Sequence, residues 1–285
     1  SGVPYEMLVV IDKDMWERPA GRALFNALDT DVPGLPQPER SFRISQIIPD
    51  KFERGFRIFR NIIDVDIQPI YTQPKLKYSR DSYSSPQMIM TIQAPDEASF
   101  EEFVNQNKQV IVDFFTSVEM NRQIENLKQK HNPQALETVK ELFGCELMIP
   151  VEMSGEKRGE NFVWLSDFNS VNPEILSFVM YSYPYTSTDN FSLENYIQKR
   201  DSVMKKNMPG GKPGQYIQTE KEYVTLTETS YRDRYMQIAR GLWYMENDMM
   251  GGPFVSHARV DQPNGRVVVV EAFVYAPEKK KRDLM

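Results

Sequence analysis

The sequence predicts an α+β fold, with mixed strands and helices in the N-terminal half and a mostly antiparallel sheet with one helix in the C-terminal half. Two observations predict it. Short apolar runs and helical periodicities alternate through the first half without a fixed repeat, whereas the second half carries long alternating segments separated by turn residues. The 285 residues suffice for two domains. We expect them at residues 1–155 and 156–285, and one continuous domain is the alternative because no flexible linker separates the halves.

Composition excludes several classes of protein. The chain has 34 Lys and Arg against 40 Asp and Glu, a net charge of −6, which argues against a nucleic-acid partner. A hydrophobic fraction of 40% excludes wholesale disorder, and no apolar run approaches the ~18 residues of a membrane span. One cysteine, Cys145, and two histidines, His131 and His257, leave no internal disulfide and no Cys/His zinc motif. We expect no metal and no cofactor.

The first elements follow from apolar runs and breakers. Residues 5–11 form a short β-branched run typical of a buried strand. Pro19 suits the first position of a helix that continues to Leu28. Three prolines within residues 29–39 predict an extended loop, and alternation over residues 42–48 predicts a half-buried strand.

The next segment changes period. Asp50 and Glu53 have the spacing of a capping box, and aromatic residues at helical spacing predict a helix that runs on to Ile63. Strands are expected at residues 63–67 and 87–93, and residues 71–86, which show no period, are expected to form an irregular loop.

Two helices and a hairpin complete the first half. A broad apolar stripe predicts the longest helix from Pro95 to Lys130, with a kink in its polar last third. Asn132-Pro133 and Gly144 delimit a second helix. Residues 146–153 and 161–166 are expected to form a hairpin around a polar turn.

The second half is rich in strands. Asn264-Gly265 between β-branched runs is a strong hairpin signal. Pro277, followed by good helix formers, predicts a helix start that continues past Met285, and a solvated basic tail is the equally supported alternative. The remaining expected elements are strands at 175–183, 216–229, 235–245, 254–260 and 267–275, and a helix over 193–204.

The best candidate for chemistry is Asp12-Lys13-Asp14, directly after the first strand. This arrangement is similar to the haloacid dehalogenase phosphotransferases, in which the first Asp attacks phosphorus and both carboxylates hold Mg²⁺. The signature departs from that pattern at Met15-Trp16, and no acidic pair completes the site downstream. The better supported interpretation is that Asp12 or Asp14 caps the following turn.

The most unusual segment is residues 240–254. Its adjacent glycines, Gly251 and Gly252, allow close backbone approach, and the neighbouring Met249 and Met250 supply adaptable apolar surface beside Trp243. The segment is either a binding lip or a wide hairpin connection packed on the core, and the structural interpretation is favoured. The candidate binding residues of the whole chain are Asp12, Asp14, Trp16, Trp243, Met249, Met250, Gly251 and Gly252.

Three segments of the sequence resemble one family. They are Val9-Val10-Ile11-Asp12-Lys13-Asp14-Met15-Trp16, Leu35-Pro36-Gln37-Pro38-Glu39 with Phe42-Arg43-Ile44, and Gly241-Leu242-Trp243 to Phe254. They are similar to a Bacteroidetes domain-of-unknown-function family, whose closing strand resembles residues 271–277. The resemblance implies an envelope lipoprotein, with a signal peptide and a lipidated cysteine ahead of the mature domain. It carries over no catalytic residue.

Two functions follow as the main hypotheses, and a scaffold or assembly subunit with an exposed apolar patch around Trp243, Met249 and Met250 is a third. The first is a lipid-anchored domain facing the periplasm that binds an envelope protein or ligand without catalysis, touches the membrane only through its anchor and takes no nucleic acid. The second is a hydrolase that uses acidic residues, with a divalent metal near Asp12 and Asp14. The sequence itself does not decide whether the chain is an enzyme, and it assigns no catalytic residue.

Overall fold

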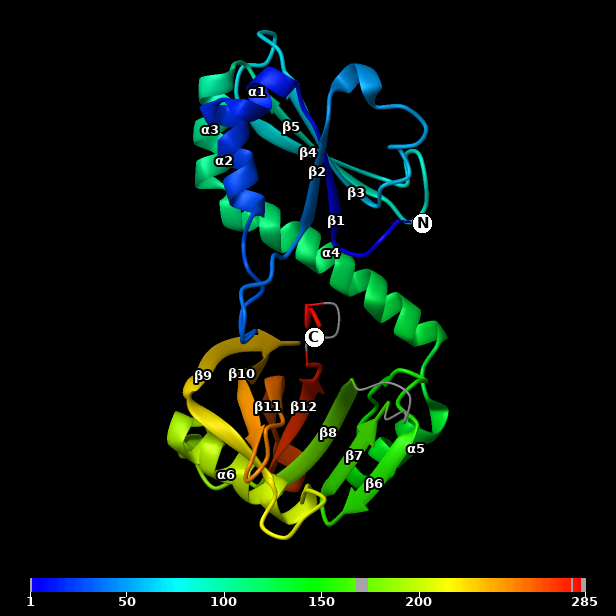
Figure 1. Ribbon diagram of the computed structural model, residues 1–285, viewed down its shortest axis with the longest axis vertical. Helices are drawn as coiled ribbons and strands as arrows, with labels where there is room; N and C mark the ends of the chain where they lie inside the picture. The colour runs from blue at the N-terminus through cyan, green and yellow to red at the C-terminus, as the bar shows by residue number, and fades with distance from the viewer. Residues whose placement is uncertain (1, 168–173, 278, 283–285) are drawn as a thin grey trace. The chain divides into compact units, whose positions relative to one another are not determined.

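The computed structural model describes residues 2–167, 174–277 and 279–282. The chain divides into two compact units: unit 1 is Ser1–Asp31 with Arg40–Asn126, and unit 2 is Val32–Glu39 with Leu127–Met285. Both combine helices with a sheet (Figure 1), which confirms the predicted α+β class. The division falls inside one helix, whereas the sequence placed a boundary near residue 155. The difference arises because the segment from Leu127 to residue 155 packs on the sheet of unit 2.

Unit 1 is built on a five-stranded sheet of order β2-β1-β3-β5-β4. The first four strands are parallel, and β4 is an antiparallel edge strand. The elements are β1 (Glu6–Val10), α1 (Lys13–Glu17), α2 (Pro19–Leu28), β2 (Arg43–Ile47), a 3-10 turn at Pro49–Lys51, β3 (Asn61–Ile67), β4 (Lys75–Arg80), β5 (Met88–Ala94), α3 (Glu97–Gln106) and α4 (Lys108–Gln129), which continues past Asn126.

The core of unit 1 lies on the helix-covered face of this sheet. Met7, Val9 and Ile11 alternate onto that face and pack against residues of all four helices. Leu8 and Val10 point to the other face, where a smaller cluster forms. Because β1 is buried on both faces, its sequence is a continuous apolar run rather than an alternating one.

Two local predictions in unit 1 are wrong. Instead of a helix after Asp50, only Pro49–Lys51 forms a 3-10 turn. The aromatic residues Phe52 and Phe59 pack on the second face of the sheet, and the buried Gln87 side chain donates to the carbonyls of Arg57 and Phe59. These tertiary contacts replace the hydrogen bonds of a helix. The expected loop at 71–86 contains β4, whose polar, exposed sequence has no clear period.

The long helix is also divided differently from the prediction. The break between α3 and α4 falls at Asn107, whose side chain donates to the carbonyl of Phe103, and not in the polar last third. Further along α4, Glu119 is fully buried. Its carboxylate pairs with Arg60 at 3.0 Å and Arg122 at 2.8 Å and accepts from Asn61 at 2.7 Å, so it fastens the helix to the sheet.

Unit 2 is built on a seven-stranded antiparallel sheet of order β6-β7-β8-β12-β11-β10-β9. Its elements are α5 (Pro133–Phe143), β6 (Gly155–Gly159), β7 (Phe162–Ser166), β8 (Ile175–Pro184), a 3-10 turn at Thr188–Phe191, α6 (Leu193–Asn207), β9 (Ile217–Tyr231), β10 (Arg234–Met245), β11 (Gly251–Asp261), a 3-10 turn at Gln262–Asn264 and β12 (Arg266–Tyr275).

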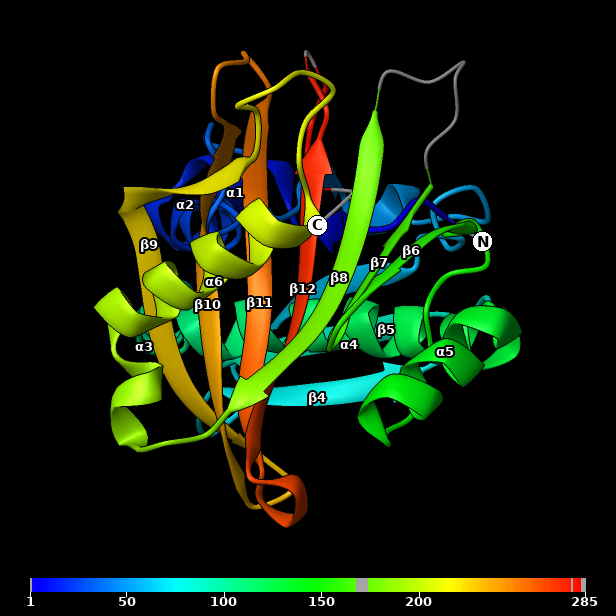
Figure 2. The same cartoon turned by 90° about the horizontal axis from the view of Figure 1, so that it is seen from below.

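The two faces of this sheet carry different helices. Figure 2 shows α6 lying across one face, where its residues Tyr196, Ile197 and Met204 join the larger core cluster. On the opposite face, α5 packs against Val163 and Leu165 of β7. Side chains two residues apart on a strand share a face. The face under α6 carries the odd-numbered residues of β8, β10 and β12 and the even-numbered residues of β7 and β11.

Two predictions in unit 2 are wrong. Residues 146–153 form no strand, and the first strand of the hairpin is β6, in the segment expected to be the turn. The polar sequence Gly-Glu-Lys-Arg-Gly has little β-propensity, and pairing with β7 holds it extended. No helix forms at residues 279–282; Glu278 and residues 283–285 lie outside the described residues.

The loop Val32–Glu39 belongs to unit 2 although both its flanks belong to unit 1. The Glu39 side chain is mostly buried, and its carboxylate accepts from the backbone N–H groups of Lys281 at 2.8 Å and Arg282 at 3.0 Å. A carboxylate on two backbone donors is a charge-assisted contact. It holds the described end of the chain against this loop.

Candidate ligand pocket

The face of the sheet under α6 has two ends with different chemistry. On β12 it carries Glu271 and then, two and four residues further on, Phe273 and Tyr275. We call the region around Glu271 the networked end, and the region around Phe273 and Tyr275 the pocket end. Because α6 stops at Asn207, the pocket end lies where the helix ends, beside Met208 and Pro209.

The networked end contains a fully buried ion pair. Arg200 of α6 and Glu271 of β12 are both 0% exposed. The guanidinium donates to the carboxylate through Nε at 3.0 Å and 3.1 Å and through Nη2 at 2.7 Å. Its remaining nitrogen, Nη1, donates to the hydroxyl of Thr219 at 2.8 Å. Every nitrogen of the guanidinium therefore has a partner within the chain, which is what burial of a charge demands.

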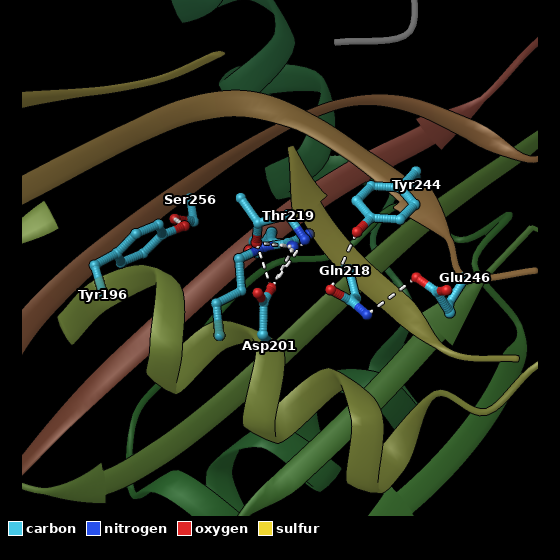
Figure 3. Close-up of polar contacts among 9 residues, drawn as sticks. Tyr196, Asp201, Gln218, Thr219, Tyr244, Glu246 and Ser256 are labelled. Carbon is cyan, nitrogen blue, oxygen red and sulfur yellow. Dashed lines mark hydrogen bonds and ion pairs between the residues drawn. The ribbon is translucent and has the colours of Figure 1, made fainter. Parts of the chain in front are cut away.

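Further hydrogen bonds extend this network (Figure 3). Thr219 of β9 donates from its backbone N–H and its hydroxyl to Asp201, at 2.9 Å and 2.6 Å. The hydroxyls of Tyr196 and Ser256 share a hydrogen bond of 2.6 Å between α6 and β11. These contacts join the helix to three strands.

Burial shifts the pKa values in this region. Burial opposes the charge of Arg200, but the attraction of Glu271 and its hydrogen bonds outweigh that effect and raise the pKa of the arginine. Burial raises the pKa of Tyr196, and the nearby charge of Glu271 adds to the shift. Burial also raises the pKa of Tyr183, to about 12. The tyrosines are therefore neutral at physiological pH and packed as core residues.

The pocket end holds a cavity of about 150 Å³. Its walls come from six strands, from the segment after α6 and from the connection between β10 and β11, and most of the lining side chains are aromatic or aliphatic. We call it the apolar pocket. Its lining residues are Lys157, Trp164, Ile175, Ser177, Met208, Pro209, Ile217, Trp243, Met245, Met250, Phe273 and Tyr275.

Two of the lining residues that carry polar groups lie next to each other on neighbouring strands. Lys157 of β6 and Trp164 of β7 are directly opposite each other in the ladder. The ammonium of Lys157 donates to the backbone carbonyl of Asn207 at 2.7 Å, at the C-terminal end of α6. The indole nitrogen of Trp164 is buried and finds no acceptor among the residues that the structure describes.

The unusual segment at residues 240–254 supplies part of this wall. Trp243 and Met250 line the pocket. The indole N–H of Trp243 donates to the carbonyl of Val274 at 3.2 Å, which fixes the ring in place. A Cβ on Gly252 would lie 2.0 Å from that same oxygen, and one on Gly251 would lie 2.8 Å from the carbonyl of Trp243. Met249 is 100% exposed and takes no part.

The other candidate residues lie in unit 1. The Asp12 carboxylate accepts from the backbone N–H groups of Asp14 and Met15, at 2.9 Å and 3.1 Å, and so caps α1. The side chain of Asp14 is exposed, and Trp16 packs in the core. Within the described parts of the chain, no group of three or more His, Cys, Asp or Glu residues is arranged to hold a metal ion. The geometry gives Asp12 a structural role.

Several pocket residues escaped the sequence reasoning. Trp164 and Lys157 form a cross-strand pair, but the sequence placed Lys157 in a turn, so the pairing could not be inferred. Phe273 and Tyr275 lie in a strand that was predicted, but placing them on the same face as Trp164 requires the order and the register of the strands. The sequence contains one indication of the buried pair of Arg200 and Glu271: Arg200 interrupts the apolar face of the helix predicted over residues 193–204.

Comparisons with known proteins give little functional information. No curated protein matches the sequence. A human structure, the "StarD13 (DLC2) lipid transfer and protein localization domain", is 10% identical and covers 54% of this chain and 87% of its own, with a TM-score of 0.24, a value that supports no argument. None of the helices in the described residues is long and apolar enough to cross a membrane.

Two family models match the chain in succession. Residues 1–128 match a domain of unknown function, DUF8532, and residues 132–285 match another, DUF4837. The two matches meet close to the point where α4 passes from unit 1 to unit 2. The second covers more than half of the 285 residues. The chain therefore belongs to the DUF4837 family, a family of unknown function.

Proposed function

We propose that this chain is a non-catalytic binding protein of the cell envelope, and that unit 2 takes a small apolar group into the apolar pocket. The pocket is the observation that carries the binding role. A cavity of about 150 Å³ with apolar walls is large enough for a group the size of benzene. Three methionines in its lining, Met208, Met245 and Met250, can adapt to the shape of a ligand.

No observation favours the hydrolase hypothesis in its place. The carboxylate that it required, Asp12, accepts two backbone hydrogen bonds at the start of a helix. The pocket lining contains no carboxylate, histidine or cysteine among the described residues. The hydrolase hypothesis relied on acidic residues for its acid–base chemistry, and none of the described lining residues is acidic.

The binding role is tested with benzene and with a variant that fills the pocket. Ser177 lines the pocket and is 2% exposed, so Ser177→Leu places a larger apolar side chain there. We expect benzene to raise the melting temperature of the natural chain and to have little effect on Ser177→Leu. Ser230→Leu, on an exposed position of β9, is the matched control and should respond like the natural chain. Absence of any response to benzene in the natural chain contradicts the binding role.

Two parts of this proposal rest on the resemblance of the sequence motifs to a family of envelope lipoproteins. They are the location in the cell envelope and a partner in that compartment. The resemblance predicts a lipid-anchored domain facing the periplasm. The complete gene provides the test: a leader with an apolar core and a cysteine should precede Ser1. A gene without them contradicts the location and leaves the binding role of the pocket intact.

A further inference from the structure

The apolar pocket contains one buried hydrogen-bond donor whose acceptor is absent from the described residues, the indole N–H of Trp164. A buried donor without a partner costs free energy, and native proteins rarely retain one without a reason. The second indole in the same lining behaves differently, because Trp243 donates to the carbonyl of Val274. The two indoles thus differ: the N–H of Trp243 is bonded within the chain, and that of Trp164 has no acceptor among the described residues.

The second polar group is the ammonium of Lys157, on the strand next to Trp164. Residues directly opposite each other in an antiparallel ladder have Cβ atoms about 5 Å apart and project from the same face. The ammonium has three hydrogens, and its contact with the carbonyl of Asn207 uses one of them. Two hydrogens are left for an acceptor that lies beside Trp164.

The charge at the pocket has one sign. Among the described lining residues Lys157 alone is charged, and all the others are neutral. The acidic Glu160, close in sequence, is paired with Lys206 at 3.0 Å. An anionic ligand group near Lys157 and Trp164 would gain charge-assisted hydrogen bonds, while a cationic group would meet repulsion.

We propose that the natural ligand of the apolar pocket is a small carboxylate amphiphile: an apolar body of benzene-like volume that fills the pocket and a carboxylate that accepts from Trp164 Nε1 and Lys157 Nζ. This proposal rests on the proposed binding function and adds the chemical class of the ligand. Its two parts use separate features, since the body depends on the apolar walls and the head on the two donors.

Three probes separate these parts: benzene has no acceptor, hexanol has a neutral one, and hexanoate has a charged one. Binding is measured by titration calorimetry and by the shift in melting temperature. We expect hexanoate to bind the natural chain about tenfold more tightly than hexanol, as one charge-assisted contact provides. Hexylamine should bind more weakly than hexanol.

Two variants remove the donors singly. Trp164→Phe keeps an aromatic ring in the wall, and we expect it to weaken hexanoate binding about tenfold and hexanol binding less, with benzene unchanged. Lys157→Met keeps an apolar stem and should reduce the affinity for hexanoate to that for hexanol. Lys221→Met, at an exposed lysine of β9 outside the lining, is the control and should leave all affinities unchanged.

The outcomes distinguish the two proposals. If benzene binds but hexanoate binds no better than hexanol, the carboxylate proposal is wrong and the pocket remains a binding site for apolar groups. An unchanged preference for hexanoate in both Trp164→Phe and Lys157→Met also overturns it. If benzene does not bind the natural chain, the proposed function itself fails.

Discussion

The networked end and the pocket end of one sheet face differ in how their polar atoms are used. Around Arg200 and Glu271 every nitrogen of a buried guanidinium is bonded within the chain. Two residues further along β12, the walls become apolar, a cavity opens, and a buried indole N–H has no acceptor among the described residues. The difference teaches that buried polarity by itself does not mark a site. A polar network that is complete holds the fold together, and an incomplete one beside a cavity indicates a ligand.

The largest effect is expected from breaking the networked end. Arg200→Met removes the guanidinium and leaves Glu271 buried without a compensating charge, so the free energy of unfolding should fall by about 3–5 kcal/mol. Urea denaturation of the purified chain measures this loss. The double variant Arg200→Met with Glu271→Met removes both charges and should recover most of the stability. A double variant as unstable as the single one would show that the hydrogen bonds to Thr219, and not the buried charge, dominate.

Gly252→Ala tests whether the pocket wall depends on close backbone approach. The new methyl group would lie 2.0 Å from the carbonyl oxygen of Val274, which also accepts from Trp243. We expect a loss of about 1–3 kcal/mol in the free energy of unfolding, because backbone has to move, together with weaker benzene binding. Gly211→Ala is the matched control, since a Cβ there meets nothing within 4 Å. Equal effects at both positions would argue against a specific role for Gly252.

Alkaline pH tests the burial of Tyr183 near the networked end through its effect on the free energy of unfolding. Free tyrosine releases its proton near pH 10, whereas burial raises the pKa of Tyr183 to about 12. Between these values the folded chain binds more protons than the unfolded chain, so stability falls as the pH rises from 10 to 12. Tyr183 alone should contribute a loss of about 1.4 kcal/mol at pH 11. Urea unfolding at pH 9 and pH 11 measures it, and Tyr183→Phe should lose correspondingly less.

The smallest effect on stability is expected at Asp12 in unit 1. Its carboxylate, like Glu271 at the networked end, is bonded within the chain. Asp12→Ala removes two hydrogen bonds at the start of α1 and should cost about 1 kcal/mol in the free energy of unfolding. Asp14→Ala changes an exposed side chain and should stay within about 0.5 kcal/mol. Mg²⁺ should shift the melting temperature of neither variant nor of the natural chain. A stabilising effect of Mg²⁺ that disappears in both variants would revive the metal hypothesis.

The strongly patterned elements of the fold could be predicted from the sequence. Apolar runs predicted β1 and β5, and Asn264-Gly265 predicted the hairpin of β11 and β12. The failures share a cause. The aromatic residues after Asp50 have helical spacing, yet they pack on the sheet as part of a loop. The exposed strands β4 and β6 are held by pairing with a neighbour, which leaves no periodic signal in their own residues.

The candidate site was predicted only in part. The segment around Trp243 and Met250 was singled out because its composition is unusual, and the structure places both residues in the pocket wall. Met249 beside them is fully exposed, since neighbouring residues in a connection point in different directions. The pair of Trp164 and Lys157 depends on strand register, and the pocket as a whole depends on strand order. Neither is encoded in the spacing of residues along one segment.

The position of Glu39 has a practical consequence for producing fragments of this protein. The match to the DUF4837 model begins at Asn132, and a fragment that starts there would omit Val32–Glu39. Such a fragment would leave the amide groups of Lys281 and Arg282 without the carboxylate that they bind. The polypeptide passes from one unit to the other three times, so a single proteolytic cut does not yield two complete halves. Recombinant work on the C-terminal half should therefore supply the excised octapeptide in trans or graft it onto the fragment.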